Sequence, residues 1–219
     1  MYFFLILFCS LIIFYKIRKI YSFSKYKGLR YFANGFLFLA IAFCVRFTVM
    51  LMKILEDNNI TGTINEFNFF IIATEFTMVL PGLFFGYSLL WKKFEKEHYG
   101  LGIMTQIPIY ILALTIALID YFLKTLNTMY ISQIILFFSI SVILYYRLKQ
   151  KENKNNKFML TFFVSMILFF FIWILNFIAQ YTINFAPMMR IYTYILTTIT
   201  CFVMLYLIIN LTKNHKKSR

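Results

Sequence analysis

The sequence contains few of the residues that build familiar active sites or disulfide-linked folds. Its 219 residues include 8 acidic residues, 3 cysteines and 2 histidines. The cysteines all lie inside apolar stretches, whereas the disulfides of an extracellular domain join cysteines in outer segments. Both histidines lie outside those stretches, so metal or serine chemistry inside a membrane has no histidine ligand or base. We therefore lean away from an enzyme and expect no cofactor and no metal site.

Three further absences narrow the classes of membrane protein. A retinal protein needs a buried lysine in its last span, and the stretch 187–211 has none. An intramembrane aspartyl protease needs two facing aspartates, and Asp120 is the only aspartate inside an apolar stretch. No glycine-rich phosphate-binding loop with its lysine is present. Binding, transport and assembly remain, together with lipid-modifying chemistry built from loop residues.

Apolar residues dominate what is present. The chain is 62% hydrophobic and 21% aromatic, with a mean hydropathy of +0.77. Most of its apolar stretches approach the roughly 20 residues that a helix needs to cross about 30 Å of hydrocarbon. Because a helix satisfies its own backbone hydrogen bonds in lipid, we predict an all-α, polytopic membrane protein. The seven predicted transmembrane helices are 1–15, 31–52, 69–91, 101–123, 128–146, 158–180 and 187–211, forming one domain, 1–211, followed by a short basic tail, 212–219.

The basic residues fall in alternate gaps between these stretches. Of 22 lysines and arginines, 18 lie in 16–30, 92–96, 147–157 and 213–219. The positive-inside rule therefore predicts an outside N-terminus and a cytoplasmic C-terminus in a multi-pass protein of the cell membrane. The net charge of +14 does not indicate nucleic-acid binding, because the cations sit in short loops where they meet anionic inner-leaflet lipids. Because these loops are short, we expect any intracellular output to pass through a cytoplasmic or membrane partner.

Charged residues inside the stretches are the strongest functional signal. A charge at a helix centre costs about 2.5–3.5 kcal/mol on insertion scales. Arg46 lies about 22 Å along the second stretch from its inner end, and Glu75 about 9 Å below the outer end of the third. Their similar depth on consecutive helices predicts an Arg46–Glu75 ion pair. Replacing Glu75 with glutamine would break this pair and destabilise the protein. Asp120 lies close to the outer end of the fourth stretch.

Other polar residues also gather in the outer halves. Gln133, Asn176 and Arg190 lie there on three further stretches, whereas the inner halves are rich in phenylalanine and leucine. The pattern predicts an outward-facing polar pocket for a small molecule or ion, above a dry inner plug. Arg46 and Glu75 would form the floor of that pocket. The alternative is that the two residues form a structural pair while the others only contact water at the outer interface.

The third stretch contains Pro81-Gly82 near its middle. Proline removes a backbone donor and clashes with the preceding turn, so a kink is expected there. Such a kink is either a hinge or a means of fitting neighbouring helices together. Gly82 and Gly86 also match the small-residue spacing that allows close helix packing, which favours an interior position for this helix.

Two local segments resemble known groups of proteins. The segment Glu75-Phe76-Thr77-Met78-Val79-Leu80-Pro81, followed by Phe84, resembles the third helix of the seven-helix sensor region that precedes some microbial histidine kinases. The segment Lys27-Gly28-Leu29-Arg30-Tyr31-Phe32, continuing to Arg46, is similar to uncharacterised archaeal membrane proteins of this topology. The first resemblance implies a sensor, although the sequence contains no kinase domain.

Three functions fit these observations. The first is a sensor-like or accessory subunit that binds an outside ligand and acts through a partner by movement about Pro81-Gly82. The second is a small-solute transporter, or the substrate-binding membrane subunit of one. The third is a structural subunit of a larger membrane complex without a ligand.

Overall fold

The computed structural model describes residues 2–57, 64–97, 106–149, 157–182 and 186–217, and these residues are almost entirely helical. The all-α class predicted from the sequence is confirmed. The helices are α1 (Tyr2–Ser24), α2 (Lys27–Asp57), α3 (Ile64–Glu97), α4 (Ile107–Leu123), α5 (Asn127–Lys149), α6 (Lys157–Tyr181) and α7 (Ala186–Lys217).

The helix ends differ from the predicted ends of the apolar stretches. Helix α1 ends at Ser24 rather than at residue 15, and its buried face extends past Lys16 to Ile17. Helix α7 continues to Lys217, so residues 212–217 of the predicted tail are helical. The predicted beginning of the fourth stretch, 101–105, lies outside the described residues. Hydrophobicity marks the part of a helix that suits lipid, whereas backbone hydrogen bonding sets where the helix stops.

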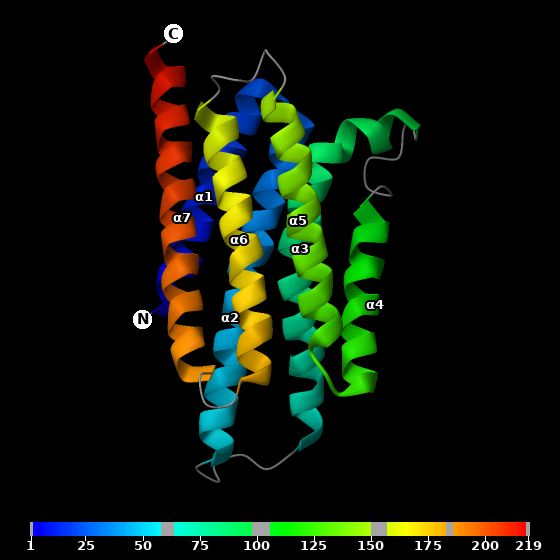
Figure 1. The fold of residues 1–219 in the computed structure, drawn as a ribbon. Coiled ribbons are helices and arrows are strands. Elements are labelled where there is room, and N and C mark those ends of the chain that lie inside the picture. The colour runs from blue at the N-terminus through cyan, green and yellow to red at the C-terminus, as the bar shows by residue number, and fades with distance from the viewer. Residues whose placement is uncertain (1, 58–63, 98–105, 150–156, 183–185, 218–219) are drawn as a thin grey trace.

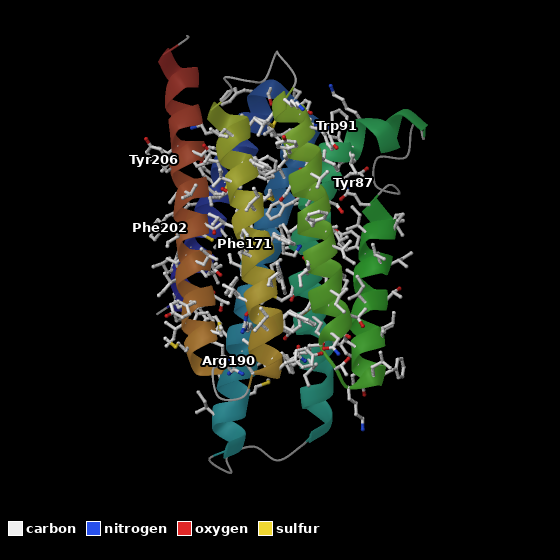
Figure 2. The ribbon with its side chains drawn as sticks, in the orientation of Figure 1. Tyr87, Trp91, Phe171, Arg190, Phe202 and Tyr206 are labelled. Carbon is white, nitrogen blue, oxygen red and sulfur yellow. The ribbon has the colours of Figure 1, made fainter. Side chains whose placement is uncertain are left out.

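Within the described residues, five helical segments are long and apolar enough to cross a membrane: Lys27–Met52, Phe70–Lys92, Asn127–Lys149, Met159–Tyr181 and Met188–Ile209. Helix α4 is apolar but shorter, at 17 residues. Large apolar side chains cover the outer faces of the bundle, as Phe171, Phe202 and Tyr206 illustrate by pointing away from it (Figure 2). Five such helices and an apolar exterior indicate a membrane protein.

Six of the helices form a closed ring. Helices α1, α2 and α3 pack in sequence, α3 packs against α5, α5 against α6, α6 against α7, and α7 returns to α1. Helix α4 packs against the outside of this ring on α3 and α5, at one edge of the bundle (Figure 1). Helices α3 and α5 pack directly against each other, so α4, which lies between them in the sequence, is not part of the ring.

The ring has two chemically different ends. The α1–α2 connection and the C-terminal ends of α3, α5 and α7 lie together at the top of Figure 1. This end, called here the basic end, carries the basic residues of 16–30, Lys92, Arg147 and Lys149. The α4–α5 connection and the end of α6 lie at the opposite end. The alternation of charge along the sequence therefore becomes a separation of charge in space.

A layer of phenylalanines fills the ring towards the basic end. Phe32, Phe36, Phe85, Phe137, Phe162 and Phe169 are all buried there. Ring centroids lie 5.0 Å apart for Phe32 and Phe162 and for Phe36 and Phe85, and 5.4 Å apart for Phe137 and Phe169. Such contacts between aromatic rings add to the energy of simple burial. The layer agrees with the dry plug predicted from the sequence.

Candidate functional site

A cavity of about 290 Å³ lies inside the ring, between the phenylalanine layer and the opposite end. All six ring helices and Leu126 of the α4–α5 connection contribute side chains to it, whereas α4 contributes none. Its charged, amide and hydroxyl-bearing lining residues are Tyr2, Arg46, Thr74, Glu75, Tyr130, Gln133, Asn176, Thr193, Tyr194 and Thr197. The arrangement can contact a small molecule with both polar and apolar groups from six helices.

Four of the six predicted pocket residues line this cavity: Arg46, Glu75, Gln133 and Asn176. The two predicted hinge residues, Pro81 and Gly82, line it as well. Asp120 and Arg190 are not among its lining residues. Most of the predicted residues therefore lie together, and the two outside the lining are those nearest the ends of their helices.

The predicted ion pair between Arg46 and Glu75 is not formed. Glu75 is 3% exposed, and its Oε2 atom has no hydrogen-bond partner. Arg46 is half-buried on another wall of the cavity. Equal depth does not bring two side chains together unless their helices also turn them towards one another. Glu75 instead lies within electrostatic range of Asp120, so the predicted contact with Arg46 is wrong.

Gln133 holds α5 against the part of α3 that precedes Pro81. Its Nε2 atom donates a hydrogen bond to the carbonyl oxygen of Val79 at 3.4 Å. Its Oε1 atom is buried without a hydrogen-bond partner. A Cβ atom on Gly82 would overlap that oxygen and would lie 2.5 Å from Leu136 Cδ2. Gly82 therefore allows the close approach of α3 to α5 that puts the Gln133 amide in the cavity wall.

Asp120 joins α4 to α5. Its backbone carbonyl accepts a hydrogen bond from Thr125 N at 3.1 Å, beside a left-handed Lys124, which terminates α4. Its side chain accepts hydrogen bonds from Thr128 N at 2.9 Å and Met129 N at 2.6 Å. These are among the amides that the first turn of α5 leaves without helical partners. A 1% exposed carboxylate is thus held by a helix N-terminus, which gives Asp120 a structural role that the sequence prediction did not include.

Arg190 is exposed near the start of α7, at the end of the bundle beyond the cavity (Figure 2). It lies within electrostatic range of the Tyr130 hydroxyl. Asn176 donates from Nδ2 to the carbonyl oxygen of Ile172 on its own helix at 3.0 Å. Arg190 therefore adds a positive charge near the cavity without lining it. Asn176 lines the cavity with a side chain whose amide nitrogen already donates a hydrogen bond.

Several lining residues gave no signal in the sequence. Tyr2 and Tyr194 pack with ring centroids 4.3 Å apart, and Tyr130 and Trp173 with centroids 5.9 Å apart. Threonines of α3 and α7 bond to carbonyls of their own helices, as Thr197 Oγ1 does to Thr193 at 2.6 Å. Aromatic residues and threonines are frequent throughout this chain, so only their position in the folded ring distinguishes these from the others.

The cavity extends deeper than predicted. Phe85, Phe137 and Phe169 line it at the side of the phenylalanine layer. Phe85 lies ten positions beyond Glu75 along α3, which corresponds to about 15 Å. The floor is therefore aromatic, and Arg46 and Glu75 lie well above it. Among the described residues, no three histidine, cysteine or acidic side chains lie close enough together to hold a metal ion.

Comparisons with known proteins place the chain only broadly. No family model matches the sequence, and no solved structure matches it. The chain is similar to an uncharacterised protein of the archaeon Archaeoglobus fulgidus, with 26% identity over 183 residues that cover 81% of this chain and 75% of the relative. The predicted resemblance to uncharacterised archaeal proteins is confirmed at this level. The resemblance to histidine-kinase sensor regions stays a prediction.

Proposed function

We propose that this chain is a seven-span protein of the cell membrane that binds a small ligand in the six-helix cavity and signals its presence to a partner. The N-terminus would lie outside and the basic end in the cytoplasm, against anionic lipids. The observation that supports the proposal most strongly is the cavity itself. It is lined by all six ring helices and presents buried acceptor oxygens of Glu75 and Gln133 that have no donor.

Helix α3 provides a physical connection between the cavity and the basic end. Pro81 and Gly82 line the cavity. Seven positions beyond Gly82, about 10 Å along the helix, the carbonyl oxygen of Leu89 accepts a hydrogen bond from Arg147 Nη2 of α5 at 2.8 Å. Trp91 packs against Tyr26 beside α2 with ring centroids 5.4 Å apart. A ligand that moved α3 about Pro81-Gly82 would therefore change contacts with α2 and α5 at the basic end.

A crosslinked pull-down from native membranes, with a tag after Arg219, tests the signalling part of this proposal. A stoichiometric kinase or response protein is the expected result. Capture of an ATPase pair or of several other membrane subunits would contradict the sensor role and favour transport or assembly. The matched binding test is the melting temperature of the purified protein with and without the dialysable metabolites of the source cells, because a ligand that binds only the folded state stabilises it.

Transport is the second candidate, and the position of Pro81 and Gly82 in the cavity wall favours it, since a helix can bend at an internal proline and so alternate between two arrangements. The phenylalanine layer argues for sensing, because it closes the ring between the cavity and the basic end. Uptake into liposomes discriminates the two functions. A transporter would accumulate solute in a manner sensitive to Glu75→Gln, whereas a sensor would bind without flux. A structural subunit would show neither activity and would be unstable when purified alone.

A further inference from the structure

We propose that the ligand of this cavity is a small zwitterion with an ammonium group, a carboxylate and an apolar remainder, of the class of the α-amino acids with apolar side chains. The inference rests on the proposed ligand-binding function and specifies its chemistry. Three properties of the cavity support it: a carboxyl group and a guanidinium group in one lining, an unpaired amide oxygen in the same lining, and an apolar wall.

The acceptor side of the cavity lies on α3 and α5. Glu75 Oε2 and Gln133 Oε1 are both buried, and neither has a hydrogen-bond partner. The two side chains are 3% and 1% exposed. Buried polar atoms are satisfied in nearly all folded proteins, so two such oxygens lining one cavity indicate a donor that comes from a ligand. A primary ammonium group supplies several N–H donors and a positive charge that suits a carboxyl oxygen.

The donor side lies on α2. Arg46 lines the cavity and, among the described residues, makes no ion pair. Tyr2 and Tyr130 lie within electrostatic range of it, and both also line the cavity. Guanidinium groups bind carboxylates in a fixed, two-pronged geometry. A cation alone would leave Arg46 without a counter-ion, and an anion alone would leave the Glu75 oxygen without a donor. A zwitterion compensates both.

The remaining wall and the volume define the rest of the ligand. Leu39, Met78, Ile172 and Trp173 line the cavity between the polar groups and the phenylalanine floor. A cavity of about 290 Å³ lies near the small end of the range of ligand pockets, about 300–1,000 Å³. It has room for leucine or phenylalanine, which present an apolar side chain beyond their charged groups.

The test compares each amino acid with analogues that lack one charge. The purified full chain is melted alone and with leucine, isoamylamine and isocaproate, and again with phenylalanine, phenethylamine and hydrocinnamate. At saturation, an amino acid is expected to raise Tm by about 5 °C, with the matched amine and acid far less effective. Arg46→Gln should reduce the difference between the Tm increases caused by the amino acid and by the amine. Glu75→Gln should reduce the difference between the Tm increases caused by the amino acid and by the acid. Arg190→Gln is the matched control, because Arg190 lies outside the lining, and should leave the preference unchanged.

The outcomes separate this inference from the proposed function. An amine or an acid that stabilises as well as the amino acid would overturn the zwitterion assignment. A response to dialysable metabolites without any response to these compounds would also overturn it, while leaving the ligand-binding function intact. The absence of both responses would contradict the inference and the function together. The selectivity changes are measured on protein that melts cooperatively, so a variant that fails to fold is replaced by Arg46→Lys or Glu75→Asp.

Discussion

Gly82 of α3 and Gln133 of α5 are in direct contact, and a Cβ atom at position 82 would overlap the Gln133 amide oxygen. Four residues further along the same helix, a Cβ atom on Gly86 would meet Ile140 Cδ1 at 3.7 Å, an ordinary contact distance. The two glycines share a sequence motif but not a role. Only at Gly82 would a Cβ atom overlap side-chain atoms of α5.

Gly82→Ala is therefore expected to destabilise the protein, whereas Gly86→Ala should not. Overpacking costs about 1–3 kcal/mol, and the higher helix propensity of alanine recovers up to about 1 kcal/mol. We expect a net loss of about 1–2 kcal/mol for Gly82→Ala and a change between zero and a small gain for Gly86→Ala. Thermal unfolding of the purified variants measures both. Equal stability of the two variants would show that the close contact at Gly82 does not constrain the bundle.

Asp120→Ala should destabilise the protein without altering ligand selectivity. The substitution leaves the amides of Thr128 and Met129 at the start of α5 without their acceptor, at an expected cost of about 1–3 kcal/mol. Thr125→Val is the control, because the Thr125 hydroxyl is 3.5 Å from Asp120 Oδ1 and its loss should cost little. A change in ligand preference with unchanged stability would instead place Asp120 in the binding site.

Glu75→Gln should leave the unliganded protein at least as stable as the parent. The expectation from the sequence was the opposite, because it assumed an ion pair with Arg46. Since Glu75 Oε2 has no partner, glutamine preserves the shape of the side chain and removes the cost of burying a charge. Thermal unfolding without ligand measures this. A loss comparable to that of Asp120→Ala would show that Glu75 is held by an attractive interaction after all.

The proposed orientation is tested by cysteine labelling at two matched lysines. Lys25 and Lys124 are both exposed and both have a φ of 53°, and they lie at opposite ends of the bundle. In a Cys44→Ala background, which removes the exposed native thiol, a membrane-impermeant reagent should label Lys124→Cys in intact cells. It should label Lys25→Cys only after permeabilisation. The reverse pattern would invert the topology and place the basic end outside.

The sequence predicted the elements of the fold better than their arrangement. Long apolar stretches identified seven helices, because the length that crosses lipid is visible in composition. That α3 meets α5 and leaves α4 outside the ring was not visible, since it depends on which faces carry small residues such as Gly82. The depth of Arg46 and Glu75 followed from counting, but their lack of contact depends on the rotation of each helix. The position of Asp120, an acidic residue shortly before a new helix, indicates a carboxylate that stabilises the start of that helix. The sequence prediction placed Asp120 among the pocket residues instead.

The most direct test of ligand binding in the six-helix cavity is mass spectrometry of small molecules released by denaturing protein that was purified from native membranes. The parent chain is compared with an Arg46→Gln, Glu75→Gln double variant that melts cooperatively. We predict a small-molecule species in near-stoichiometric amount from the parent and its loss from the double variant. Release of the same species in equal amount from both proteins, or of no such species from either, would contradict ligand binding at this site.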